Sequence, residues 1–118
     1  MLNPEQRQLF HKFIILEMAV QSLQRDFSVI ENLKMSKVYL PILEKLLKDI
    51  SQDYYNTKRL LANKKVRLVK WEKIDEYFTD IQVATAGNDV VLRYANQAMK
   101  TQVEKLLISH LKKSNQDT

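Results

Sequence analysis

The feature that most constrains this chain is a long alternation of three- and four-residue spacings between apolar positions near its start. Such spacing places the apolar side chains on one face of an α-helix. A polar connector and a second set with similar spacing follow, which predicts two long helices packed as an antiparallel hairpin. The two sets are Leu9, Phe13, Leu16, Val20, Leu23, Phe27 and Ile30, and then Leu40, Leu43, Leu47, Ile50, Tyr54 and Leu61.

Local signals indicate where these two helices lie. Asn3 is a favourable N-cap residue, and Pro4 suits the first helical position, so the first helix is expected within residues 1–33. The second is expected over residues 36–63, where Pro41 would bend its start or move it a few residues later.

The pattern changes after the second helix. Residues 66–95 contain stretches rich in β-branched and aromatic residues, which predict three short strands. The strongest turn signal of the chain is Ala86-Gly87-Asn88-Asp89, and it holds the only glycine. A small antiparallel sheet with a hairpin at Gly87-Asn88 is therefore expected.

The end of the chain returns to helical spacing. Asn96 is expected to cap a C-terminal helix over residues 96–113, and residues 114–118 form a polar tail. At 118 residues, the chain is expected to form a single domain, residues 1–118. The predicted fold class is α+β and mainly helical: a long antiparallel helical hairpin, a small antiparallel sheet and a C-terminal helix.

Few residues offer catalytic or metal-binding chemistry. The chain has no cysteine, which excludes disulfides and thiolate sites, and its single glycine excludes the usual phosphate-binding loops. His11 and His110 are interpreted as surface or boundary residues. The acidic stretch Asp75, Glu76 and Asp80 is interpreted as a solvated turn rather than a cation site. We therefore expect no enzyme activity, no cofactor, no metal and no small-molecule substrate.

The sequence also bears on location. Met1 to Arg7 lacks a basic start followed by an apolar run, so no signal peptide is expected. The longest apolar run, Phe13 to Leu16, is too short to cross a bilayer. Together with the absence of cysteine, these features predict a cytoplasmic protein without a membrane partner.

Positive charge is concentrated in the middle of the chain. The net charge is +5, and residues 34–65 carry eight basic groups against three acidic ones. The segment around the single tryptophan is strongly basic, with one acid, Glu72, in its span. The candidate nucleic-acid-binding residues are Lys58, Arg59, Lys64, Lys65, Arg67, Lys70, Trp71 and Lys73.

Two interpretations of that basic segment remain open. Basic groups neutralise phosphates and aromatic rings stack on bases, which favours nucleic-acid binding. Alternatively, the cations solvate a helix end and Trp71 belongs to the core. Strand geometry is expected to point Arg67 and Trp71 to the same face, because they are four residues apart.

The first helix has more apolar surface than one neighbour can cover. Its apolar stripe is wider than a two-helix seam, so it must meet the sheet, the last helix or a second copy of the chain. A homodimer is a common solution for such a surface. The candidate self-association residues are Phe10, Ile14, Ile15 and Met18.

Several short strings resemble the YhjD-like family of small Bacillus proteins. The matching strings are Ile15 to Val20, Leu23-Gln24-Arg25-Asp26, Val29-Ile30-Glu31, Tyr39-Leu40, Leu43-Glu44, Asp75-Glu76, Phe78-Thr79, Gly87, Arg93-Tyr94-Ala95-Asn96 and Val103-Glu104-Lys105-Leu106. The chain departs from the family pattern between Ile81 and Leu92. The resemblance implies a stand-alone bacterial cytosolic protein and assigns it no activity.

Two functional hypotheses follow. The first is a non-enzymatic interaction or regulatory protein that acts through helix faces and self-associates, as a homodimer or with another protein partner. The alternative is a nucleic-acid-binding regulator that uses the basic segment Lys58 to Lys73 and Trp71.

Overall fold

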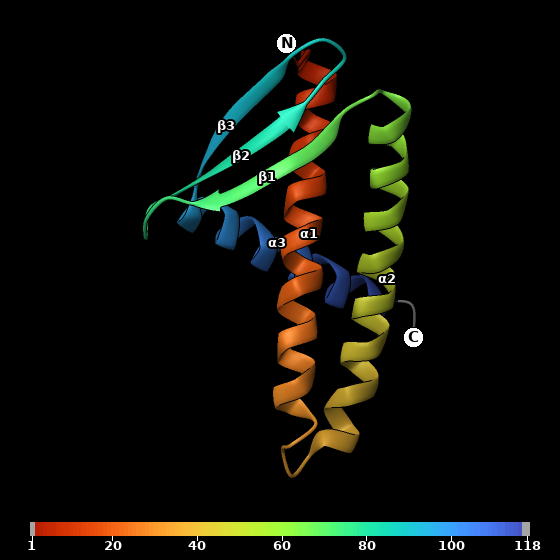
Figure 1. Ribbon diagram of the computed structural model, residues 1–118. Coiled ribbons are helices and arrows are strands. Elements are labelled where there is room, and N and C mark those ends of the chain that lie inside the picture. Colours follow the sequence, from red (N-terminus) through yellow and green to blue (C-terminus); the bar gives the residue numbers. More distant parts are fainter. Residues whose placement is uncertain (1, 117–118) are drawn as a thin grey trace.

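A computed structural model describes residues 2–116. The elements follow the order α1 (Pro4–Ile30), α2 (Ser36–Asn63), β1 (Arg67–Lys73), β2 (Phe78–Ala84), β3 (Asp89–Ala95) and α3 (Asn96–Gln116). This is the predicted mainly helical α+β architecture, with an antiparallel helical hairpin and a small sheet (Figure 1).

The start of α1 is set by a capping box. The Asn3 Oδ1 accepts a hydrogen bond from the Gln6 backbone N–H at 2.7 Å, and the Gln6 Oε1 accepts one from the Asn3 N–H at 3.1 Å. Pro4 occupies the first turn, where its missing N–H leaves no hydrogen bond unmade. The helix ends at Ile30, earlier than the expected residue 33, because turn hydrogen bonds replace the helical pattern from residue 32.

The second helix begins at Ser36 as expected and contains Pro41 within its second turn. Proline lacks an N–H, so this turn gives up one helical hydrogen bond without breaking the helix. At the other end of the chain, α3 begins at Asn96 and continues to Gln116, three residues beyond the expected Lys113. The predicted tail is therefore partly helical, and its last two residues lie outside the described part.

The three strands form an antiparallel sheet in the order β1-β2-β3. The four-residue connection Thr85–Asn88 joins β2 to β3, and Gly87 within it has φ +105°, a conformation that favours glycine. This confirms the predicted hairpin. Ile81, Val83 and Thr79 point from β2 into the core.

The core lies between the sheet and the N-terminal half of α1. Figure 1 shows the sheet over this half of α1, while α3 crosses behind α1. The fully buried residues of the core include Phe10, Ile14 and Leu16 from α1 and Ile50 from α2. Both helices then continue well past the sheet, so the far end of the hairpin is covered only by itself (Figure 1).

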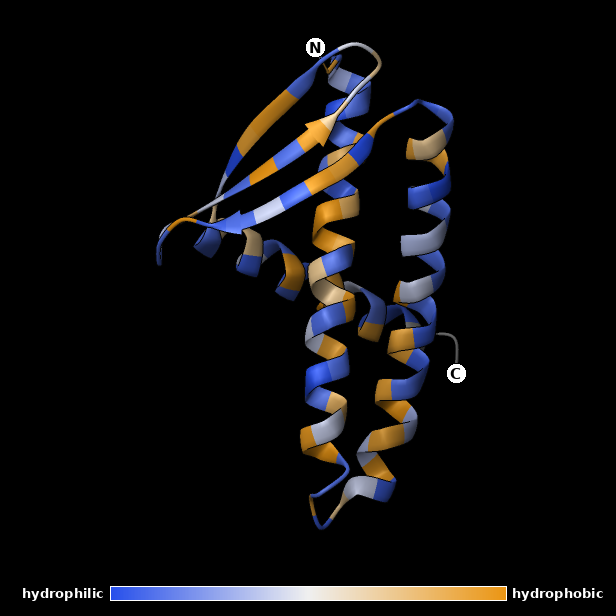
Figure 2. Ribbon diagram, in the orientation of Figure 1, coloured by the Kyte–Doolittle hydropathy of each residue, from blue (hydrophilic) through white to orange (hydrophobic). Residues whose placement is uncertain are grey.

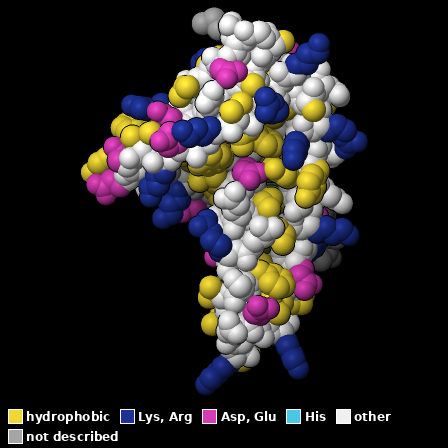
Figure 3. Space-filling view, viewed as in Figure 1, with side chains coloured by type: hydrophobic (Ala, Val, Ile, Leu, Met, Phe, Trp, Pro, Cys, Tyr) yellow, Lys and Arg dark blue, Asp and Glu magenta, His cyan; other side chains and the backbone are white. Residues whose placement is uncertain are grey.

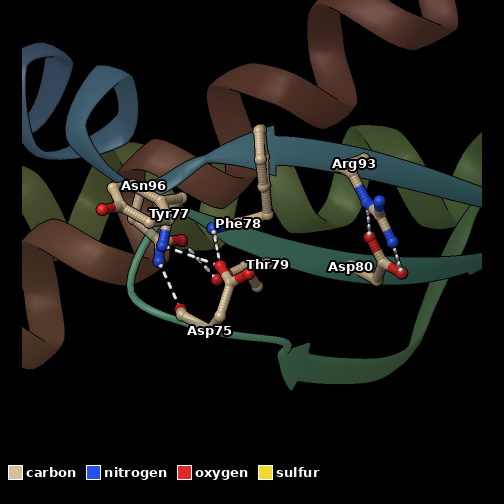
Figure 4. A network of polar contacts seen from close by, with 7 residues as sticks. All are labelled: Asp75, Tyr77, Phe78, Thr79, Asp80, Arg93 and Asn96. Carbon is tan, nitrogen blue, oxygen red and sulfur yellow. Dashed lines mark hydrogen bonds and ion pairs between the residues drawn. The ribbon is translucent and has the colours of Figure 1, made fainter.

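A polar network fixes the β1–β2 turn to the start of α3 (Figure 4). The Asp75 carboxylate accepts hydrogen bonds from the backbone N–H groups of Tyr77 and Phe78, both at 2.8 Å. The Asn96 amide donates to the Asp75 carbonyl at 3.0 Å and accepts from the Thr79 hydroxyl at 2.6 Å. Asp75 and Glu76 therefore lie in a turn as interpreted, whereas the same interpretation is wrong for Asp80, which lies in β2 and forms an ion pair with Arg93.

Candidate functional site: the hairpin tip and the interhelical cavity

The far end of the helical hairpin exposes large apolar side chains. Met35, Val38 and Ile42 leave 60%, 58% and 54% of their surfaces exposed. Figure 2 shows hydrophobic residues along both helices as far as their connection. We call the following exposed set the tip surface: Val29, Leu33, Met35, Val38, Tyr39 and Ile42.

The tip surface exists because the start of α2 has two apolar stripes. Leu43, Leu46 and Ile50 face α1 and are buried. Met35, Val38 and Ile42 follow the same three- and four-residue spacing on another side of the helix and remain exposed. The sequence contains this second stripe, but the prediction of the hairpin rests on the stripe that continues along the whole helix.

Nearer the sheet, a cavity of about 660 Å³ lies between α1, α2, the start of β1 and the β2–β3 connection. Its apolar wall includes Phe13, Leu61 and Leu68, and Lys58, Lys65 and Arg67 also line it. Figure 3 shows hydrophobic side chains gathered in the hollow between β1, α1 and α2, with Lys and Arg side chains around it.

Aromatic packing forms one side of this cavity. The Tyr54 ring stacks on Phe13 with the ring centroids 5.3 Å apart, and the Lys58 Nζ lies 6.0 Å from the Tyr54 centroid. Burial and the neighbouring Glu17 carboxylate raise the pKa of the Tyr54 hydroxyl above its usual range. Tyr54 therefore stays neutral at physiological pH. Glu17 also accepts a hydrogen bond from the Gln21 amide at 3.0 Å.

The end of α2 places Lys65 beside the cavity in an unusual backbone conformation. The Val66 N–H bonds to the Leu61 carbonyl and the Lys65 N–H to the Ala62 carbonyl, both at 3.0 Å. These two bonds define a Schellman motif, in which the residue at position 65 must be left-handed and is usually glycine. Lys65 has φ +59°, which is unfavourable for a residue with a side chain.

The candidate nucleic-acid-binding residues differ in their partners and in the cavities that they line. Lys64 pairs with Glu5 at 3.2 Å, and Lys70 pairs with Glu72 at 3.3 Å. Arg59 bonds to the side chain of Asn56. Only three of the set, Lys58, Lys65 and Arg67, line the same cavity, whereas Trp71 and Lys73 line a separate one with Met18 and Arg25.

The expectation that Arg67 and Trp71 share a face is wrong. The pairing of β1 with β2 shifts between Leu68 and Lys70, which leaves Val69 as an extra residue. Arg67 consequently pairs with Ala84 and Trp71 with Ile81, positions three apart and thus on opposite faces of β2. Trp71 packs against the core on the inner face, as the second interpretation expected.

The candidate self-association residues lie inside the chain. Phe10, Ile14 and Ile15 are buried, and Met18 packs against the same core. The sheet and α3 cover the wide apolar stripe of α1, so these residues offer no surface to a second copy. The exposed apolar side chains of the hairpin are most numerous at the tip surface, and Tyr55 and Leu60 farther along α2 are exposed as well.

Both histidines join helices to their neighbours. The His11 Nε2 lies 2.6 Å from the Gln102 Oε1, and its ring stacks on Tyr94. The His110 Nε2 lies 3.7 Å from the Asp53 carboxylate. The interpretation of both as boundary residues with structural contacts agrees with these positions.

The fold and these surfaces define a mainly helical α+β protein built on a protruding helical hairpin. Comparison with protein families shows that the chain belongs to the YhjD protein family, whose model matches residues 1–115. No curated protein and no solved structure matches the chain. Within the described residues, none of the helices is both long and apolar enough to cross a membrane.

Proposed function

We propose that this protein is a non-enzymatic interaction protein that self-associates through the tip surface. The observation that supports this is the concentration of exposed apolar side chains where the hairpin extends past the sheet and α3. Six large apolar side chains, each about half exposed, present on the order of 500 Å². The largest apolar patch on a monomeric protein is usually of about this size, and such patches are often functional.

The area of the tip surface favours a second copy of the chain as the partner. Two such patches in contact bury on the order of 1,000 Å², which is the lower limit for a specific interface. The same patch serves both sides of a two-fold symmetric contact, so no further surface is needed. An interface near this limit is expected to form at micromolar concentration.

The charges beside the apolar stripe suit an antiparallel pairing of the two α2 helices. Lys37 and Glu44 are both exposed and seven residues apart, so they lie on the same side of the helix, toward the two ends of the stripe. When two copies pair head to tail around residue 40, Val38 of one copy meets Ile42 of the other. The Lys37 of each copy then lies near the Glu44 of the other.

Sedimentation velocity on two variants tests the proposal. Ile42→Glu places a charge at the centre of the interface and removes an apolar contact worth about 1.5–3 kcal/mol, so dimerisation should weaken by at least about tenfold. Ile108→Glu is the matched control, because Ile108 on α3 is 51% exposed against 54% for Ile42. The wild type and Ile108→Glu should sediment at twice the 14.0 kDa chain mass at tens of micromolar. A monomeric wild type would contradict the proposal, as would equal effects of the two substitutions.

A further inference from the structure

The interhelical cavity combines an apolar interior with cations that have no ion-pair partner. Among residues 2–113, whose side chains the structure describes, Lys58, Lys65 and Arg67 form no salt bridge. The neighbouring cations Lys64 and Lys70 are both paired with carboxylates. Among the same described residues Arg59 and Lys73 also form no salt bridge, so what distinguishes Lys58, Lys65 and Arg67 is that all three line one cavity.

The one acidic side chain in the lining does not neutralise these three cations. Glu17 is held by Gln21 and lies beside Tyr54. With three cations and one carboxylate, the cavity carries a net positive charge while most of its wall is apolar. A cavity of about 660 Å³ lies within the size range of sites for small organic ligands.

Lys65 adds an independent observation. Its position in the Schellman motif favours glycine, yet a lysine occupies it and takes the left-handed conformation at an energetic cost. Strained residues of this kind are common at binding sites. Because Lys65 makes no ion pair within the described side chains, the folded chain gains no salt bridge that offsets this strain.

We propose that this cavity binds a small amphipathic anion, a molecule with an apolar chain or ring and one carboxylate or phosphate group. The apolar part packs against Phe13, Leu61 and Leu68. The anionic group lies at Lys58, Lys65 and Arg67. The Tyr54 ring, with Lys58 above it, forms the wall between these two parts.

This proposal is independent of self-association. The cavity is lined by residues of the middle of α1, the second half of α2 and the sheet, whereas the tip surface lies where α1 ends and α2 begins. Ile42→Glu should therefore bind the anion as well as the wild type does. Failure of either proposal can then be recognised without the other.

Isothermal titration calorimetry with decanoate, below its micellar concentration, tests this proposal. Decanol and decyltrimethylammonium serve as controls, because they have the same chain length but a neutral and a cationic head group. Decanoate should bind at least about tenfold more tightly than either, since several charge-assisted contacts act on its carboxylate. Lys65→Ala should weaken decanoate binding about three- to tenfold, and Lys64→Ala should leave it unchanged because Lys64 points to Glu5.

Three results would overturn the assignment. The first is the absence of decanoate binding to the folded wild type. The second is equal binding of decanoate and decanol, which would mean that the cations play no part. The third is an equal loss for Lys64→Ala and Lys65→Ala, which would indicate general attraction to a basic surface. A second variant, Ala62→Trp, fills the cavity from α2 and should abolish binding while circular dichroism shows an intact fold.

Discussion

Replacing Lys65 by glycine should leave the protein more stable than replacing it by alanine. In the Schellman motif that ends α2, position 65 is left-handed with φ +59°. Glycine adopts this conformation without a steric penalty, whereas the Cβ of any other residue contacts the following carbonyl. Both backbone hydrogen bonds of the motif remain available to glycine, and the buried contact between Leu61 and Val66 is untouched.

The magnitude follows from comparing Lys65→Gly with Lys65→Ala. Both variants remove a cation from the C-terminal end of the helix, which costs up to about 1 kcal/mol. The two variants differ only at the backbone. The left-handed conformation destabilises the alanine variant by about 1–2 kcal/mol. Glycine avoids this cost but loses more conformational entropy on folding, which destabilises the glycine variant by about 0.5–1 kcal/mol. The glycine variant should therefore be more stable than the alanine variant by about 0.5–1 kcal/mol.

Thermal unfolding followed by circular dichroism measures this difference. For a chain of 118 residues, 1 kcal/mol corresponds to about 4 °C in Tm, so Lys65→Gly should melt about 2–4 °C above Lys65→Ala. The reference is Lys64→Gly, because Lys64 has φ −90° and gains nothing from glycine. A glycine variant that melts at or below the alanine variant would refute the left-handed conformation of residue 65.

Two further predictions concern the sheet. The hydrogen bond and charge of Arg93 lower the pKa of the Asp80 carboxyl group. The Asp80–Arg93 ion pair therefore stabilises the fold above about pH 4, and this stabilisation is lost as the pH falls through the lowered pKa. Arg93→Gln should therefore lower Tm at neutral pH and have little effect near pH 2, and an equal loss at both values would contradict this. Because Trp71 faces the core, single-stranded DNA at low salt should not quench its fluorescence. Strong quenching would contradict this and would indicate that Trp71 contacts nucleic acid.

The order of the elements and the first residues of the helices could be predicted because their signals are local. Asn3 and Pro4 begin α1 through contacts within four residues, and Gly87 supplies the positive φ that its turn requires. The spacing of apolar residues identified α2 from Ser36 despite Pro41. Each of these features depends on neighbours in the sequence and not on the rest of the fold.

The sites could not be predicted in the same way because they depend on packing. Alternation along β1 cannot reveal that Val69 is an extra residue, and that one residue places Arg67 and Trp71 on opposite faces. Similarly, α2 has two apolar stripes, and only the position of the sheet and α3 decides that Ile42 remains exposed. The buried positions of Phe10 and Ile14 follow from the same arrangement.

Cysteine cross-linking tests the self-association of the tip surface most directly. The natural chain has no cysteine, so each introduced thiol is the only one present. Mixing the Val38→Cys and Ile42→Cys variants under mild oxidation should give a disulfide-linked dimer, because an antiparallel pairing around residue 40 brings these two positions together. Leu60→Cys, an equally accessible position on the same helix outside the tip surface, should form no disulfide-linked dimer. Cross-linking of the mixed pair no faster than that of Leu60→Cys would contradict the account.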